Sequence, residues 1–226
     1  MPNFISEEQI EEALIQKLQM LHGYDSLNCY TEDPEDLNDG SHRASKREVI
    51  LVDRLTQAAI ELNGDIPEKV ILDAIGTFAE RRQSMSLVAA NKDIYELLRG
   101  GIPVEYDDAK GSKHKEQLRL IDFKSPADNH FLAVSQLWIK GEIGFRRPDV
   151  LLYVNGIPLV FIEVKNSNVR LRTAYDDNLV TYKKEIPQLF QPNAFCVLSN
   201  AIETRVGSLT AEWEHFFTWL RPDDEK

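Results

Sequence analysis

The feature that most constrains the fold is a pair of apolar segments joined by Asn155-Gly156. Residues 150–154 (VLLYV) precede this dipeptide and residues 157–162 (IPLVFI) follow it. Asn-Gly between two apolar segments is a strong indication of a β-hairpin, because tight hairpin turns require positive φ angles that Asn and Gly tolerate. Both segments are apolar at nearly every position. This predicts that both faces of the hairpin are covered and that it lies in the centre of a sheet.

Charged residues continue these strands without an intervening turn. Asp149 stands before the first strand, and Glu163 and Lys165 extend the second. Glu163 and Lys165 are two residues apart and therefore share a face. Two carboxylates that converge on one point favour a divalent cation with oxygen ligands, such as Mg²⁺. A lysine beside the metal suits the positioning or deprotonation of an attacking water. The alternative is that the sheet ends near Val164 and that these charges are solvated strand ends.

The register of the hairpin decides between these interpretations. A strict two-residue turn pairs Asp149 with Ile162, which places Asp149 on the face opposite Glu163. A shared metal site therefore requires the register to shift by one residue. We predict a bulge or irregular pairing in this hairpin, either as a left-handed bulge at Gly156 or as an irregularity near Pro148.

Hydrophobic periodicity and capping patterns predict the remaining elements. Helices are expected at about 6–21, 45–63, 67–82, 86–99, 173–185 and 209–220, and a loop at 31–41. Strands are expected at 117–123, 131–140, 150–154, 158–164 and 194–198. This order predicts an α/β (α+β) fold, in which a mixed central sheet is flanked by helices and the N-terminal part is mainly helical.

Charge and composition limit the possible functions. The net charge of −11 argues against an independent DNA-binding protein, because phosphate contacts depend on Lys and Arg. It is compatible with a nuclease that other domains hold on DNA. The apolar segments are too short to cross a membrane, and the start lacks a secretory signal. Cys29 and Cys196 are expected to be unpaired thiols in a reducing cytoplasm.

The residues around the hairpin resemble a known family. Asp149 with Glu163-Val164-Lys165 matches the PD-(D/E)xK nuclease motif, which is short and weak by itself. The longer segment 147–166 resembles the nuclease domain of the restriction (motor) subunit of type I restriction-modification enzymes, as do residues 129–136, 182–190 and 199–209. The resemblance covers most of the chain. It implies a restriction-endonuclease-like fold and an Mg²⁺-dependent endonuclease that cuts double-stranded DNA.

The resemblance also implies roles for individual residues. Asp149 and Glu163 match the metal ligands, the Val164 carbonyl is an expected further ligand, and Lys165 is expected to position the attacking water. The family has Gln-x-x-x-Tyr on the next helix. Asn178 and Tyr182 occupy these positions here, so the amide is retained on a side chain one methylene shorter.

Two further groups of residues are expected to take part. Enzymes of this superfamily often add a carboxylate from an early helix, for which Glu11 matches best and Glu7 and Glu8 are alternatives. The expected DNA-binding cations are Arg147, Arg170, Arg172 and Lys183, with Arg146 and Lys184 as additional candidates.

The family context predicts partners outside this chain. In the family, an ATP-driven motor follows the nuclease domain, and the subunit assembles with methylation and specificity subunits. The sequence has no G-x-x-x-x-G-K-[ST] phosphate loop, so ATP binding is expected only in motor domains absent here. We expect residues 1–226 to form one nuclease domain of a longer subunit. In it, a mainly helical insertion at about 24–100 accompanies a catalytic core at about 115–226, completed by the helix at 6–22. The alternatives are a non-catalytic docking or assembly module and a repair-type PD-(D/E)xK nuclease.

Overall fold

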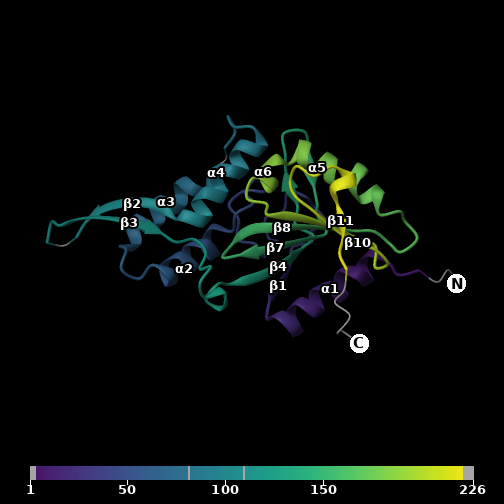
Figure 1. Cartoon of the computed structure of the whole chain (residues 1–226), viewed down its shortest axis with the longest axis horizontal. Coiled ribbons are helices and arrows are strands. Elements are labelled where there is room, and N and C mark those ends of the chain that lie inside the picture. Colours follow the sequence, from purple (N-terminus) through teal and green to yellow (C-terminus); the bar gives the residue numbers. More distant parts are fainter. Residues whose placement is uncertain (1–3, 81, 109, 221–226) are drawn as a thin grey trace.

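A seven-stranded mixed sheet forms the centre of the protein. The computed structural model describes residues 4–80, 82–108 and 110–220. The strands are arranged in the order β1-β4-β7-β8-β9-β10-β11, with helices on both sides (Figure 1). The expected α/β (α+β) architecture of the restriction-endonuclease type is confirmed. In the part of the chain that the model describes, no helix is long and apolar enough to cross a membrane.

The strands of the central sheet run in both directions. Their bounds are β1 (Asp25–Asn28), β4 (Phe131–Ser135), β7 (Val150–Val154), β8 (Ile157–Val164), β9 (Phe195–Ser199), β10 (Thr204–Gly207) and β11 (Phe217–Thr218). Strands β4, β7 and β8 form an antiparallel group. The outer pairs β1–β4 and β8–β9 are parallel. The hairpin predicted from Asn155-Gly156 is thus the β7–β8 pair, and it lies between β4 and β9.

Helices cover the two faces of this sheet. On one face, α1 (Glu7–His22) packs Ile10 and Leu14 against a small apolar cluster that includes Val150, Ile162 and Val164. The other face belongs to the main core, where the helices η2 (Ala174–Leu179), α5 (Val180–Glu185) and α6 (Pro187–Phe190) pack. Figure 1 shows α1 below the sheet and α5 and α6 above it. Successive residues at the end of β8 therefore face different helices.

The remaining helices form the side of the molecule away from the chain's N-terminus. They are α2 (Val52–Leu62), α3 (Glu68–Ala79) and α4 (Leu87–Gly100), followed by the hairpin of β2 (Ile102–Asp107) and β3 (Lys113–Leu118), which projects outward (Figure 1). The start of α2 rests on the β7–β8 turn, where Leu51 N donates to Gly156 O at 2.8 Å. A Cβ at Gly156 would lie 2.5 Å from Leu51 O, so only glycine fits.

The β7–β8 hairpin contains the predicted register shift. The turn itself is tight, with positive φ at Asn155 (50°) and Gly156 (79°) and pairing of Val154 with Ile157. Tyr153 then pairs with Pro158 but Leu152 with Val160, so that Leu159 is an extra residue in β8. The predicted irregularity is confirmed, although it lies at Leu159 and not at Gly156 or Pro148.

Three predicted elements begin or end at other residues than expected. The helix expected at 45–63 begins only at Val52, because Lys46 is drawn into a buried ion pair with Asp39 at 2.7 Å. The strand expected at 131–140 ends at Ser135. Gln136 adopts a left-handed φ of 57°, which ends regular strand geometry, and a short strand β5 (Ile139–Lys140) pairs separately with β6 (Phe145–Arg146). The strand expected at 117–123 is mostly loop, since β3 ends at Leu118.

The C-terminal segment 209–220 is not the predicted helix. It forms a short 3₁₀ turn (Trp213–His215) and the edge strand β11, which pairs with β10. Phe216 is 2% exposed and contacts Tyr175 at a ring-centroid distance of 5.4 Å. Of the apolar residues in this segment, Phe216 packs against Tyr175 of η2, next to the edge strand β11.

Candidate active site

The register shift brings Asp149 and Glu163 to the same face of the hairpin. Val150 pairs with Ile162, so the next pair outward is Asp149 opposite Glu163. Directly opposite residues of an antiparallel pair have their side chains on one face, about 5 Å apart at Cβ. The Asp149 carboxylate also accepts a hydrogen bond from the Val164 backbone N–H at 2.8 Å, which fixes it against the end of β8.

Lys165 joins the two carboxylates. Its ammonium donates to Glu163 Oε1 at 2.9 Å, and the Glu163 side chain is 1% exposed. The other oxygen, Glu163 Oε2, is buried and has no hydrogen-bond partner among the described residues. An unpaired buried acceptor is costly, by about 1–3 kcal/mol. The site therefore has one acceptor more than its own donors satisfy.

The electrostatics of the site reflect an excess of negative charge. Burial, the Asp149 carboxylate and Glu7 raise the pKa of Glu163 to about 8, against the opposing effect of Lys165. Burial also raises the pKa of Asp149, while the hydrogen bond from Val164 N–H lowers it. Burial lowers the pKa of Lys165, but Glu163 and Asp149 outweigh this and raise it overall. The cationic form of Lys165 is favoured next to two carboxylates that disfavour each other's charge.

Helix α1 adds two carboxylates at the edge of this cluster. Gln136 Nε2 donates to Glu11 Oε2 at 2.7 Å, and the Asn166 backbone N–H donates to Glu7 Oε1 at 3.3 Å. Burial raises the pKa of Glu11, and Asp149 contributes to the increase. The sequence favoured Glu11 over Glu7 and Glu8 as the early-helix carboxylate. Glu11 lies beside Asp149. Glu7, one helical turn earlier, also lies close to the Asp149–Glu163 cluster.

Asn178 and Tyr182 lie on the helix that covers the Glu163 face. Tyr182 is buried, its hydroxyl donates to Arg147 O at 3.4 Å, and its ring contacts Phe161 edge-on at 5.9 Å. Burial and the nearby Glu163 raise the pKa of Tyr182, whereas a hydrogen bond with the Asn178 side chain lowers it. The pair expected from the Gln-x-x-x-Tyr pattern is thus in mutual contact, and Tyr182 lies close to Glu163.

An acidic pocket of about 470 Å³ opens beside Asp149. Its other described lining residues are Glu7, Glu8, Glu11, Glu12, Asn28, Tyr30, Gln136 and Arg147. Arg147 is the only cation among them. A phosphate group that enters this pocket would therefore face carboxylates on most sides, and its binding requires a metal ion, Arg147 or both.

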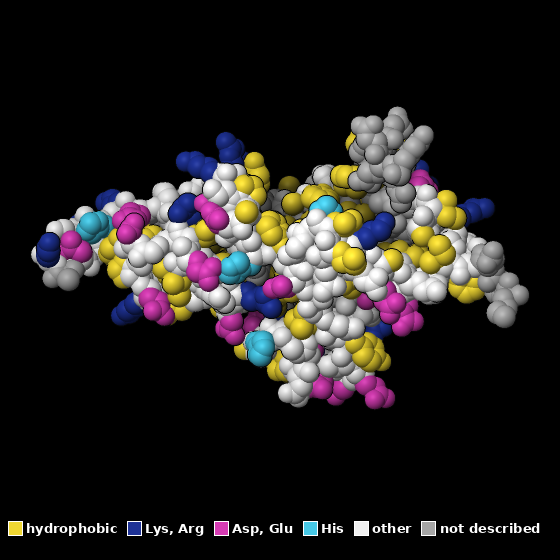
Figure 2. Space-filling model, turned by 90° about the horizontal axis from the view of Figure 1, so that it is seen from below, with side chains coloured by type: hydrophobic (Ala, Val, Ile, Leu, Met, Phe, Trp, Pro, Cys, Tyr) yellow, Lys and Arg dark blue, Asp and Glu magenta, His cyan; other side chains and the backbone are white. Residues whose placement is uncertain are grey.

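The other expected DNA-binding cations lie elsewhere or are already paired. Arg146 forms an ion pair with Glu185 at 2.5 Å, and Arg172 forms one with Asp176 at 3.0 Å. The Lys183 ammonium donates to Leu209 O at 2.7 Å, and burial lowers its pKa. Arg170 and Lys184 are exposed. Basic and acidic side chains are interspersed over the face seen in Figure 2.

Three residues at the pocket had no role in the sequence-based prediction. Gln136 holds Glu11 from a left-handed backbone conformation, which is uncommon for a residue other than glycine. Tyr30 and Trp138 flank the Arg147 guanidinium at 5.1 and 4.9 Å. A polar residue directly after the apolar strand 131–135 was a signal for Gln136. Tyr30 and Trp138 lie far apart in the chain, and no local pattern connects them.

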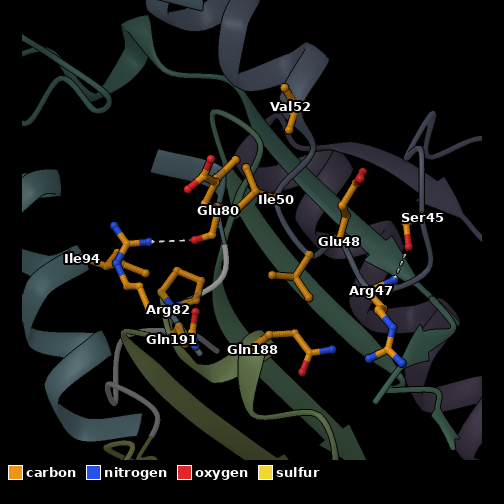
Figure 3. A pocket seen from close by; sticks show the side chains of 13 residues that line it. Ser45, Arg47, Glu48, Ile50, Val52, Glu80, Arg82, Ile94, Gln188 and Gln191 are labelled. Atoms are coloured by element: carbon orange, nitrogen blue, oxygen red, sulfur yellow. Dashed lines mark hydrogen bonds between the residues drawn. The ribbon is translucent and has the colours of Figure 1, made fainter. Parts of the chain in front are cut away.

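A second pocket, of about 220 Å³, lies where the segment before α2 meets α3, α4 and α6 (Figure 3). Its lining includes Gln188, whose Nε2 donates to Lys140 O at 2.9 Å and whose buried Oε1 has no partner within the described ranges. This pocket shares no lining residue with the acidic pocket, and its position makes it a packing gap between the helical part and the core.

The donor set beside Asp149 fits one Mg²⁺. Searched over residues 4–80, 82–108 and 110–220, the structure contains no group of three His, Cys, Asp or Glu side chains that could hold a metal ion. Mg²⁺ does not need one, because it is commonly held by one or two carboxylates and completes its octahedron with waters and substrate phosphates. Asp149 and Glu163 would supply these carboxylates, and Glu163 Oε2 is an oxygen without a competing partner among the described residues.

Comparisons with known proteins show which family the chain belongs to. Residues 4–215 match the family described as type I restriction enzyme R protein N terminus. The chain is 35% identical, over 98% of its length, to the type I restriction enzyme HindI endonuclease subunit of Haemophilus influenzae. It is 33% identical, over 96% of its length, to a Methanocaldococcus jannaschii protein provisionally named as the MjaIXP endonuclease subunit of such an enzyme. In both cases the chain spans 21% of the relative's length.

Proposed function

This chain belongs to the family of type I restriction enzyme R protein N termini, and we propose that it is a Mg²⁺-dependent nuclease domain that hydrolyses phosphodiester bonds of double-stranded DNA. The observation that carries this proposal is the group formed by buried Glu163 with the partly exposed Asp149 and Lys165, in which Glu163 Oε2 has no partner among the residues described. A purely structural ion pair has no reason to keep a second carboxylate and an unsatisfied oxygen in the same place.

The proposed metal ligands are Asp149, Glu163 and the Val164 carbonyl, with Glu11 next to them. When bound there, Mg²⁺ would offset the negative charge that grows on the phosphate during attack. The Asp149 carboxylate is held in place by the Val164 N–H, so the ligands are oriented before substrate arrives. Glu7 supports the turn after β8 through Asn166.

Lys165 is the proposed partner of the attacking water. Its ammonium already donates to Glu163 Oε1 at 2.9 Å, and its remaining N–H groups, which have no acceptor among the described residues, can orient a water or a phosphate oxygen beside the carboxylates. The surrounding carboxylates raise the pKa of Lys165, which favours a role as a hydrogen-bond donor to that water. Tyr182 and Asn178 close the Glu163 face and keep bulk water away from it.

The acidic character of the chain determines the proposed context. With a net charge of −11, the domain needs other parts of a larger protein to hold DNA. We propose that these are ATP-driven motor domains of the same subunit and the methylation and specificity subunits of a type I restriction complex in the prokaryotic cytoplasm. The length of the relatives, of which this chain spans about a fifth, supports this proposal.

Plasmid cleavage by the full-length protein, assembled with its partner subunits and supplied with Mg²⁺ and ATP, tests the function. Lys165→Ala should lower the cleavage rate by at least about 100-fold, since it removes the donor that orients the nucleophile. Lys115→Ala is the matched control, because Lys115 is exposed on β3 and pairs only with Glu105 among the described residues. Equal cleavage by the wild type and Lys165→Ala would contradict the catalytic assignment. It would favour the alternative, a non-catalytic docking or assembly module.

A further inference from the structure

The Arg147 guanidinium lies over the faces of two aromatic rings. Its guanidinium carbon lies 5.1 Å from the centroid of Tyr30 and 4.9 Å from that of Trp138. No hydrogen bond or ion pair of this guanidinium occurs among the described residues, so its five N–H donors have no protein acceptor there. The neighbouring Arg146 differs, because it is paired with Glu185. Arg147 is therefore fixed by ring faces, which leaves the edge of the guanidinium open for an anion.

The two rings are themselves anchored. Trp138 Nε1 donates to Thr31 O at 3.0 Å, and the Trp138 carbonyl accepts from Arg43 Nη2 at 3.0 Å. The Tyr30 backbone N–H donates to Asn28 Oδ1 at 2.9 Å. Arg43 belongs to the buried ion pair with Asp39. The Trp138 ring is thus attached to a rigid part of the fold, and the Tyr30 backbone is fixed beside it, although Tyr30 is 57% exposed.

The open edge of Arg147 lies at the acidic pocket. Arg147 lines this pocket together with Asp149 and Glu11, where burial raises the pKa of both carboxyl groups and the positive charge of Arg147 offsets part of that increase. A flexible arginine in this position would turn toward one of these carboxylates and form an ion pair. Contact with both ring faces opposes such a collapse, because it restricts the rotation of the guanidinium before any ligand binds.

We propose that Arg147 binds a non-bridging oxygen of the phosphate that is cut, and that Tyr30 and Trp138 are positioning residues that hold the guanidinium for this contact. The inference rests on the proposed nuclease function and adds to it the group that recognises the substrate phosphate. A guanidinium presents two parallel N–H donors to phosphate oxygens, a geometry that an ammonium does not reproduce. A bound Mg²⁺ and Arg147 would then contact the same phosphate from different sides of the pocket.

Single-turnover plasmid cleavage by the assembled full-length protein, with Mg²⁺ and ATP, tests the proposal. Arg147→Met, which keeps an apolar stem of similar length, should lower the rate at least about 100-fold. Tyr30→Leu should lower it about 10-fold, and Tyr30→Phe, which keeps the ring, should restore most of that loss. Tyr95→Leu on α4 is the matched control because Tyr95 is 56% exposed. Its cleavage should equal that of the wild type.

A double-mutant cycle separates positioning from direct DNA contact by Tyr30. If Tyr30 acts through Arg147, Tyr30→Leu has no further effect in the Arg147→Met background. The inference would be overturned if Tyr30→Leu lowered the rate about 10-fold in both the wild-type and the Arg147→Met background. It would also be overturned if Arg147→Met cleaved at the wild-type rate. Lys165→Ala, measured in parallel, distinguishes a failure of the Arg147 proposal from a failure of the proposed nuclease function. If Lys165→Ala is inactive and Arg147→Met is fully active, only the proposed role of Arg147 is rejected. If Lys165→Ala is fully active, the proposed nuclease function itself is rejected.

Discussion

Two buried charge clusters in this protein have similar components and opposite properties. Around Asp39, one carboxylate meets two cations: Oδ2 accepts from Arg43 at 2.9 Å and from Lys46 at 2.7 Å, and Oδ1 accepts from the Ser41 backbone N–H at 2.9 Å. Around Glu163, two carboxylates share one lysine, and one oxygen has no partner within the described residues.

The difference indicates what each cluster is for. The Asp39 cluster satisfies its own groups and ties the irregular segment before α2 to the loop of Trp138. In the cluster at Glu163, the second carboxylate oxygen is satisfied only when a further positive group, such as a cation or a proton, binds there. Burial of charge is thus not by itself a sign of function. An unsatisfied acceptor and an excess of one sign of charge are the informative features.

The largest expected effect on stability comes from breaking the satisfied cluster. Asp39→Ala leaves Arg43 and Lys46 buried without a counter-charge and should lower the free energy of unfolding by about 3–5 kcal/mol. Glu163→Gln, measured in metal-free buffer, should leave it unchanged or raise it, because the substitution removes repulsion between Glu163 and Asp149. Urea unfolding followed by circular dichroism measures both. A loss for Glu163→Gln as large as that for Asp39→Ala would remove the distinction between the clusters.

The core of the candidate site was predictable from the sequence because the relevant information is local. The two continuous apolar segments, the Asn-Gly turn and the charges at the strand ends lie within residues 147–166. The need for a register shift followed from the two-residue period of a strand. Its position at Leu159 did not, because there the bulged backbone is held by a distant segment: Leu159 O accepts from Ala194 N at 2.7 Å.

Other parts of the structure depend on contacts between distant segments. The irregular conformation of residues 45–51 follows from Lys46 binding Asp39, and local helix propensity does not contain that information. The enclosure of Arg147 by Tyr30 and Trp138 requires β1 and β4 to be neighbours. The edge strand β11 replaced an expected helix because its apolar spacing satisfies both structures, and pairing with β10 decided between them.

The Asp39 cluster also predicts a loss of stability in acid. Burial alone raises the pKa of Asp39, but hydrogen bonds from Lys46, Ser41 and Arg43 outweigh it and lower the pKa to about 2, from 3.8. Since the folded-state pKa is the lower one, the stabilisation is complete above about pH 4 and is lost as the pH falls toward 2. It should amount to about 2 kcal/mol.

The measurement is the difference in unfolding free energy between the wild type and Asp39→Asn, followed from about pH 5 down to about pH 2.5. The difference should shrink over this range, because a protonated Asp39 carboxyl and the amide of the variant both lack the negative charge. A constant difference would show that the hydrogen bonds, and not the charge, stabilise the cluster.

The smallest of these effects concerns the unsatisfied cluster and added Mg²⁺. If Asp149 and Glu163 hold the ion in the folded state only, Mg²⁺ at about ten times its dissociation constant should raise the free energy of unfolding by about 1.4 kcal/mol. Asp149→Asn should abolish this gain, whereas Asp73→Asn, on an exposed position of α3, should retain it. The Asp39 cluster is already satisfied by its own cations, so Asp39→Asn should lower stability by the same amount with and without Mg²⁺. If Mg²⁺ still raised the free energy of unfolding of Asp149→Asn, the ion would bind elsewhere. Glu163 Oε2 would then be satisfied by a proton and not by a metal ion.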